Sequence, residues 1–131
     1  MSKILIVEDE VMLQEVYKMV LLEQRYEVSV SSNGLEGLQT LSKFKPDIVL
    51  LDIFMPIMDG KEFLRNFSKA DYPDTKIVVY TNLSDSKTET EMLELGADKF
   101  ILKSSMTPED LTNLVDGLVV KHNVKQKGSK L

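Results

Sequence analysis

Two aliphatic segments of the chain each end in carboxylates that could act together. Residues Ile4–Val7 lead into Glu8 and Asp9, and residues Ile48–Leu51 lead into Asp52. Three carboxylates brought to one place would repel each other and have raised pKa values unless a cation compensates them. Oxygen ligands without His or Cys favour a hard cation, so the chemistry predicted here is binding of Mg²⁺, with Mn²⁺ as an alternative.

Two further aliphatic segments end in side chains that would suit such a site. Thr81 follows residues Ile77–Tyr80, and Lys103 follows residues Lys99–Leu102. A lysine about 4 Å from a carboxylate contributes roughly 4 kcal/mol of attraction at an effective dielectric constant of 20. A carboxylate can also be a nucleophile toward phosphorus, a reaction that mainly requires positioning and neutralisation of charge.

The elements that would position these residues are five strands that alternate with five helices. Aliphatic runs such as Ile48–Leu51 are typical of strands covered on both faces, and apolar residues at helical spacing follow each of them. Such alternation predicts βαβ units and a parallel sheet in a three-layer α/β sandwich. The carboxyl ends of all strands would then meet at one edge, where ligands bind in open α/β sheets. The expected strands are Ser2–Val7, Tyr26–Ser31, a central strand ending at Asp52, Ile77–Tyr80 and Lys99–Leu102; the expected helices are Val11–Gln24, one after Gly34, one holding Phe63 and Phe67, one after Ser84 and one from Pro108.

Composition restricts the class of protein. With 131 residues the chain should form one domain, and the absence of cysteine excludes disulfides and thiolate metal sites. No apolar run is long enough to span a bilayer, so we expect a cytoplasmic protein that does not bind membranes. The net charge of −5 includes four lysines and no acid in residues 121–131, which leaves −9 on the rest of the chain. Such a body should attract a divalent cation and should not bind nucleic acid directly.

Taken together, the residues at the strand ends resemble a known family. The joint pattern consists of Glu8-Asp9, Asp52 followed by Pro56 and Gly60, Thr81, and Phe100 with Lys103. This pattern is similar to that of the response-regulator receiver domain, and the resemblance covers roughly residues 3 to 120. It implies a flavodoxin-like sheet of order 2-1-3-4-5. Residues 1–120 would be the receiver domain, and residues 121–131 a basic, disordered tail or linker.

The resemblance also implies roles for the site residues. Asp52 would be the phospho-acceptor, and Asp9, Asp52 and the backbone carbonyl of Phe54 would bind Mg²⁺, with Glu8 assisting through water. Lys103 would contact the phosphoryl group.

A switch would follow from phosphorylation by the same resemblance. Thr81 would be the switch hydroxyl and Phe100 the switch aromatic. The helix after Ser84 has few apolar residues near its start, so we expect it to move at little cost. The partner surface would then comprise this helix, the strand of Phe100 and the helix from Pro108.

The family implies partners as well. Phosphate would come from a sensor histidine kinase or a histidine phosphotransfer protein in a two-component phosphorelay. The output would act on a downstream protein or a fused effector domain, and the chain would be a monomer or a phosphorylation-dependent dimer. It would be a signalling acceptor and not a turnover enzyme.

Three positions depart from the common pattern. Ser104 follows Lys103 where the family usually has a cis proline, so we expect a different loop or a trans bond there. Asn82 replaces a small residue and could crowd the phosphoryl group. Glu8 replaces the commoner aspartate and reaches one methylene further.

Three other classes of protein are alternatives to this interpretation. A phosphatase with an aspartyl nucleophile would have a second aspartate at position 54, where Phe54 stands. A flavin or nucleotide binder would have a Gly-rich loop after the first strand, whereas Glu8-Asp9-Glu10 is acidic and would repel phosphate. A receiver-like interaction module that is never phosphorylated remains an alternative.

Overall fold

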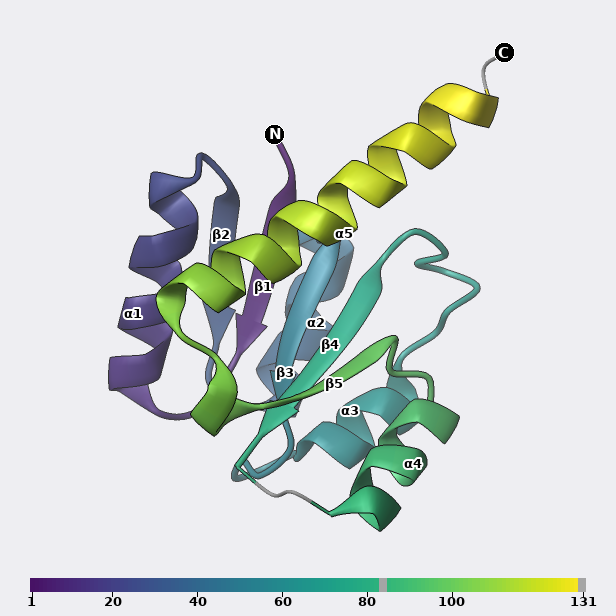
Figure 1. Cartoon of the computed structure of the whole chain (residues 1–131). Helices are drawn as coiled ribbons and strands as arrows, with labels where there is room; N and C mark the ends of the chain where they lie inside the picture. Colours follow the sequence, from purple (N-terminus) through teal and green to yellow (C-terminus); the bar gives the residue numbers. More distant parts are fainter. Residues whose placement is uncertain (83–84, 130–131) are drawn as a thin grey trace.

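The computed structural model describes residues 1–82 and 85–129, with side chains described up to residue 119. Five parallel strands form one sheet in the order β2-β1-β3-β4-β5. Helices cover both faces, with α1 and α5 in front of the sheet and α2 and α3 behind it (Figure 1). The strands are β1 (Lys3–Val7), β2 (Glu27–Ser31), β3 (Ile48–Asp52), β4 (Lys76–Thr81) and β5 (Lys99–Leu102); the helices are α1 (Val11–Glu23), α2 (Gly34–Phe44), α3 (Gly60–Asn66), α4 (Ser86–Glu94) and α5 (Pro108–Ser129), with a 3-10 turn at Lys103–Ser105. The predicted fold class and strand order are therefore confirmed.

Alternation along the strands divides the core into two clusters. Successive side chains of a strand point to opposite faces of the sheet. One cluster packs under α1 and α5 through residues such as Tyr17 and Leu111. The other packs under α2, α3 and α4 through residues such as Phe63 and Met92. Every residue of β3 is buried, which explains its unbroken aliphatic sequence.

Local capping fixes where helices begin near the site. Asn33 caps α2 by accepting a hydrogen bond from the Glu36 amide, so the helix expected after Gly34 begins at Gly34 itself. Thr107 caps α5, because Asp110 N donates to Thr107 Oγ1 at 3.1 Å and Thr107 N donates to Asp110 Oδ2 at 3.0 Å.

Two expectations from the sequence concern residues at or beyond the limits of the described structure. Ser84, at the start of the segment expected to move, lies outside them, and α4 begins at Ser86 with Asp85 as its cap. The predicted division of the chain at residue 120 falls inside α5 and stays a prediction.

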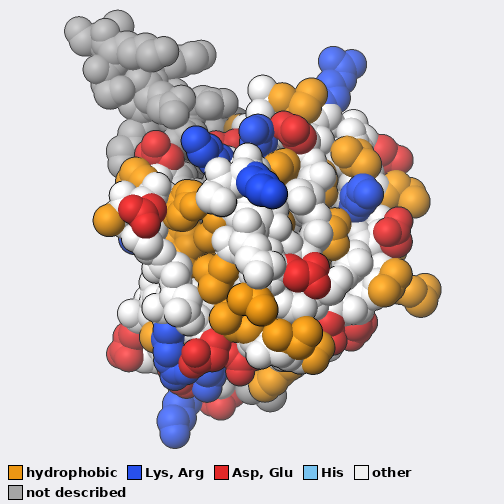
Figure 2. Space-filling model, turned by 180° about the vertical axis from the view of Figure 1, so that it is seen from behind, with side chains coloured by type: hydrophobic (Ala, Val, Ile, Leu, Met, Phe, Trp, Pro, Cys, Tyr) orange, Lys and Arg blue, Asp and Glu red, His pale blue; other side chains and the backbone are white. Residues whose placement is uncertain are grey.

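Several large apolar side chains remain at the surface. From behind, hydrophobic side chains gather below the centre of the view, among charged ones (Figure 2). Phe54 and Ile57, both on the loop from β3 to α3, are 61% and 79% exposed. No helix among the described residues is long and apolar enough to cross a bilayer.

Candidate functional site

The carboxyl edge of the sheet brings together the acids predicted from the sequence. Glu8 and Asp9 follow β1, and Asp52 ends β3 beside it. One oxygen from each of these three carboxylates lies within 4.8 Å of the others. Glu8 and Asp52 are buried, whereas Asp9 is exposed. The three residues therefore form an acidic cluster that solvent reaches from the side of Asp9.

Lys103 lies against this cluster. Its Nζ is 3.0 Å from Glu8 Oε1 and 3.3 Å from Asp52 Oδ2. Burial acts to lower the pKa of Lys103, but hydrogen bonds and charges from Glu8 and Asp52 outweigh it and raise that pKa. Lys103 is thus held as a cation, and its one charge faces three carboxylates.

Electrostatics of the cluster favour an additional cation. Burial, followed by the charge of Glu8, raises the pKa of Asp52 to about 6, against the opposing effect of Lys103. The pKa of Asp9 is also raised, first by burial and then by Glu8. All the side-chain donors are carboxylate oxygens, so the set fits a hard divalent ion such as Mg²⁺.

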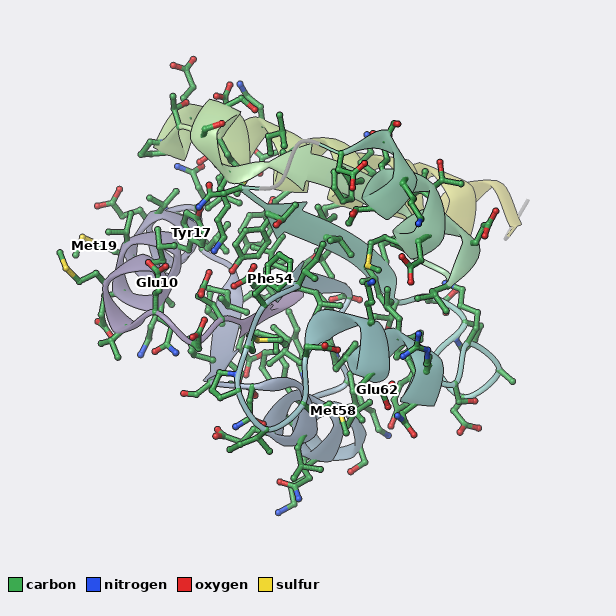
Figure 3. All side chains as sticks on the ribbon, turned by 90° about the horizontal axis from the view of Figure 1, so that it is seen from below. Glu10, Tyr17, Met19, Phe54, Met58 and Glu62 are labelled. Atoms are coloured by element: carbon green, nitrogen blue, oxygen red, sulfur yellow. The ribbon has the colours of Figure 1, made fainter. Side chains whose placement is uncertain are left out.

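A depression of about 280 Å³ opens over Asp52. Asp9, Asp52, Phe54, Thr81 and Lys103 all line it, together with Glu10 and Asn82. Figure 3 looks onto this edge, with Phe54 near the centre and Glu10 and Tyr17 on the side of α1. The depression is large enough to admit a small anionic group beside Asp52 and Lys103.

The loop after β3 approaches the end of the strand very closely. Gly60 N donates to Ile53 O at 2.8 Å. A Cβ at Gly60 would lie only 2.5 Å from the Asp52 carbonyl oxygen, so a side chain cannot be accommodated there without a shift. Asp52 Oδ1 in turn accepts from Ile53 N at 2.8 Å. Gly60 therefore lets α3 begin directly beside the strand end and fixes the loop around Asp52.

Thr81 and Phe100 occupy different surroundings. Thr81 is buried and lines the depression over Asp52. Phe100 pairs with Val79 in the neighbouring strand and lines a second depression of about 300 Å³, with Asp85, Ser86, Glu89 and Leu102. The structure therefore brings Glu8, Asp9, Asp52, Lys103 and Thr81 together, and places Phe100 apart, against the start of α4.

The departure at Ser104 has a simple structural outcome. The described residues contain no cis peptide bond, so the bond between Lys103 and Ser104 is trans. The chain after Lys103 forms a 3-10 turn in which Ser105 Oγ donates to Leu102 O at 3.1 Å.

Sequence reasoning missed one residue of the site. Tyr80, in the buried part of β4, donates its hydroxyl to Glu8 Oε1 at 3.0 Å. The available signal was its register, because Tyr80 lies directly opposite Asp52 and shares its face of the sheet.

Comparison with known proteins places the chain among signalling proteins. A family model described as "Response regulator receiver domain" matches residues 4–116. The chain is 35% identical to the chemotaxis protein CheY of Listeria monocytogenes over 79% of its length and 87% of that protein. It is 27% identical to the probable transcriptional regulator ycf29 of Porphyra purpurea, over 97% of the chain but 61% of the relative. It spans only 44% of a probable C4-dicarboxylate response regulator, DctR, of Priestia megaterium, at 33% identity.

Solved structures agree with the fold. A receiver domain protein (CheY-like) from Methanospirillum hungatei superposes with a TM-score of 0.87 at 26% identity, covering 95% of this chain and 98% of that one. The structure titled "BeF3 Activated DrrB Receiver Domain" superposes with a TM-score of 0.80 at 28% identity, covering 91% and 97% of the two chains.

Proposed function

Because the chain belongs to the response regulator receiver domain family, we propose that it is a phospho-acceptor switch of a two-component phosphorelay and that Asp52 takes the phosphoryl group. The observation that carries this proposal is the position of Asp52 between Lys103 and the acidic cluster. Its Oδ2 lies 3.3 Å from Lys103 Nζ, and a depression above it admits a phosphodonor. The donor would be a phosphorylated histidine of a sensor kinase or of a phosphotransfer protein.

The transfer itself would be a nucleophilic displacement at phosphorus. A carboxylate oxygen of Asp52 forms a bond to phosphorus while the bond from phosphorus to the donor atom breaks, and the electron pair leaves with the donor. Lys103 neutralises a phosphoryl oxygen, because its ammonium already faces Asp52. Glu8, Asp9, Asp52 and the Phe54 carbonyl would hold Mg²⁺, which when bound supplies further neutralisation of the phosphoryl charge.

The proposed response lies on the α4–β5–α5 face. The phosphoryl group would carry about 1.5 to 2 negative charges where the Asp52 carboxylate carried one, and its oxygens beside Thr81 would draw the threonine hydroxyl toward Asp52. Only Thr88 and Met92 of α4 are buried, so moving the start of this helix disrupts little packing. Phe100 would then turn into the space that the Thr81 hydroxyl vacates. Receiver domains generally act in signalling, so we propose a downstream protein or a fused effector domain as the target, with no turnover of substrate by the chain itself.

A phosphorylation assay tests this function directly. The protein is incubated with Mg²⁺ and acetyl phosphate, and intact mass measures the gain of one phosphoryl group. We expect uptake by the wild type and by Asp71→Asn, an exposed aspartate far from the site, and none by Asp52→Asn or in the presence of EDTA. Phosphate uptake by Asp52→Asn at the wild-type rate would contradict the proposal. No uptake by the wild type, from acetyl phosphate or from a histidine phosphotransfer protein, would favour a receiver-like module that is not phosphorylated.

Backbone NMR tests the switch separately. We expect exchange broadening centred on residues 81–92 of the unphosphorylated protein. Beryllofluoride should then shift these resonances and those of Phe100 and Leu102. Changes confined to the loops around Asp52 would show that the signal does not reach this face.

A further inference from the structure

Tyr80 is a neutral side chain that contacts both Glu8 and Lys103, the two charged neighbours of Asp52. Its hydroxyl donates to Glu8 Oε1 at 3.0 Å, and the Lys103 ammonium lies 5.2 Å from the centre of its ring. The ring edge of Tyr17 packs against it, with the centroids 5.6 Å apart and the planes at 75°. The Tyr80 side chain is completely buried, so neither its ring nor its hydroxyl is free to turn to solvent.

The two carboxylate oxygens of Glu8 have different partners, and the Tyr80 hydroxyl is one of them. Oε1 accepts from both Tyr80 and Lys103, while Oε2 accepts from Glu10 N at 3.0 Å. The extra methylene of Glu8, relative to an aspartate, carries the carboxylate inward to this hydroxyl. The orientation of the Glu8 carboxylate is therefore linked to Tyr80 through this hydrogen bond.

We propose that Tyr80 is a positioning residue for the metal and phosphoryl chemistry, because its hydroxyl fixes the Glu8 carboxylate in the orientation that the cation and Lys103 require. This inference rests on the proposed phospho-acceptor function. Hydrogen-bond partners of the groups around a metal hold those groups in place, and losing one typically costs 10- to 100-fold in metal affinity or activity.

The test is Tyr80→Phe, which keeps the ring, its packing against Tyr17 and its contact with Lys103. Calorimetric titration with Mg²⁺ should show affinity weakened by about 10-fold. The acetyl phosphate reaction should need correspondingly more Mg²⁺ for half-maximal rate, while its rate at saturating Mg²⁺ stays within about 2-fold of the wild type. Unchanged Mg²⁺ affinity, tighter binding, or a loss confined to the saturating rate would overturn the proposal.

The chain offers a matched control in Tyr26. Its hydroxyl also donates to a carboxylate, that of Asp116, but it precedes β2 at the opposite edge of the sheet. Tyr26→Phe removes the same kind of bond, so it should leave Mg²⁺ affinity unchanged. An equal loss in both variants would attribute the effect to general destabilisation and refute a positioning role.

A double-mutant cycle tests the coupling of Tyr80 to Glu8. In a Glu8→Asp background the shortened carboxylate cannot reach the hydroxyl, so Tyr80→Phe should then change Mg²⁺ affinity by less than about 2-fold. Additive effects of the two substitutions would overturn the inference.

A measurement on the wild type alone serves if Tyr80→Phe does not fold. With ¹³C-labelled tyrosine, the ring resonance beside the Tyr80 hydroxyl should shift on Mg²⁺ addition with the affinity found by calorimetry, and that of Tyr26 should not. A Tyr80 resonance unmoved by bound Mg²⁺ would refute the proposal. Mg²⁺ binding is read without phosphorylation, so a wild type that binds Mg²⁺ but takes up no phosphate would contradict the proposed function and not the role of Tyr80.

Discussion

Removing the charge of Asp52 should stabilise the metal-free protein. Burial and the charge of Glu8 raise the pKa of this carboxyl from 3.8 to about 6, even with Lys103 alongside. At neutral pH Asp52 is ionised in both states, and its charge has a higher free energy in the folded protein than in the unfolded chain. A rise of about two pKa units corresponds to at most about 3 kcal/mol, so we expect Asp52→Asn to increase the free energy of unfolding by about 2 kcal/mol.

The sign of the pH dependence follows from the same shift. Between pH 4 and pH 6 the folded state binds more protons at Asp52 than the unfolded state does. This contribution therefore makes the wild type more stable as the pH falls from about 7 to about 4. Asparagine does not titrate, so the advantage of Asp52→Asn should shrink over that range and disappear near pH 4.

The assay is urea unfolding in EDTA at pH 7.5 and pH 5, read by circular dichroism. The quantity compared is the difference between variant and wild type, because other groups titrate in both. Asp71→Asn is the matched control and should change neither value. Adding Mg²⁺ should stabilise the wild type more than Asp52→Asn. A variant less stable than the wild type at pH 7.5 without metal would refute the reasoning, since the pair with Lys103 would then outweigh burial.

Three more substitutions test other parts of the site. Lys103→Ala removes the cation that faces Glu8, which is fully buried, so urea unfolding in EDTA should show a loss of about 3 kcal/mol; an unchanged midpoint would mean that the fold does not require the charge of Lys103 beside Glu8. Ile57 has φ of +70° and is 79% exposed, so Ile57→Gly should raise the free energy of unfolding by about 0.5 to 1 kcal/mol, and a loss would show that its side chain packs after all. Gly60→Ala should destabilise by more than 1 kcal/mol, because its Cβ would meet the Asp52 carbonyl oxygen at 2.5 Å, and it should also slow phosphorylation; wild-type stability and rate would show that the loop adjusts freely.

The sequence predicted the elements well because local signals agree with the fold. Aliphatic runs such as that of β3 are unambiguous when both faces are covered, and the Thr107 cap marks the start of α5. The ends differ by a residue or two, as at α3, which ends at Asn66 and leaves Phe67 as its cap. The site residues at the strand ends could be predicted to lie close together because the carboxyl ends of parallel strands meet at one edge of the sheet.

Side-chain partners were harder to predict. Tyr80 was counted with the aliphatic residues of its strand, and its type alone says only that a hydroxyl needs a partner. That this partner is Glu8 depends on the sheet order and register and on the length of the glutamate, which bring residues 72 positions apart in sequence together. Such pairings can be proposed only after the register is known.

The register also separates the chemistry from the response. Tyr80 lies opposite Asp52, contacts Glu8 and Lys103, and packs with the cluster under α1 and α5. Phe100 packs with the cluster on the other face, next to the start of α4. The chain passes from one environment to the other at a single peptide, between Tyr80 and Thr81, because consecutive strand residues point to opposite faces. A change in charge at Asp52 can therefore affect both faces of the sheet. Tyr80, held by its hydrogen bond to Glu8, would stay in place on the face of α1 and α5 while Thr81 moves. On this argument Tyr80→Phe should broaden the NMR resonances of residues 81 and 82 beyond their width in the unphosphorylated wild type, whereas Tyr26→Phe should leave that width unchanged.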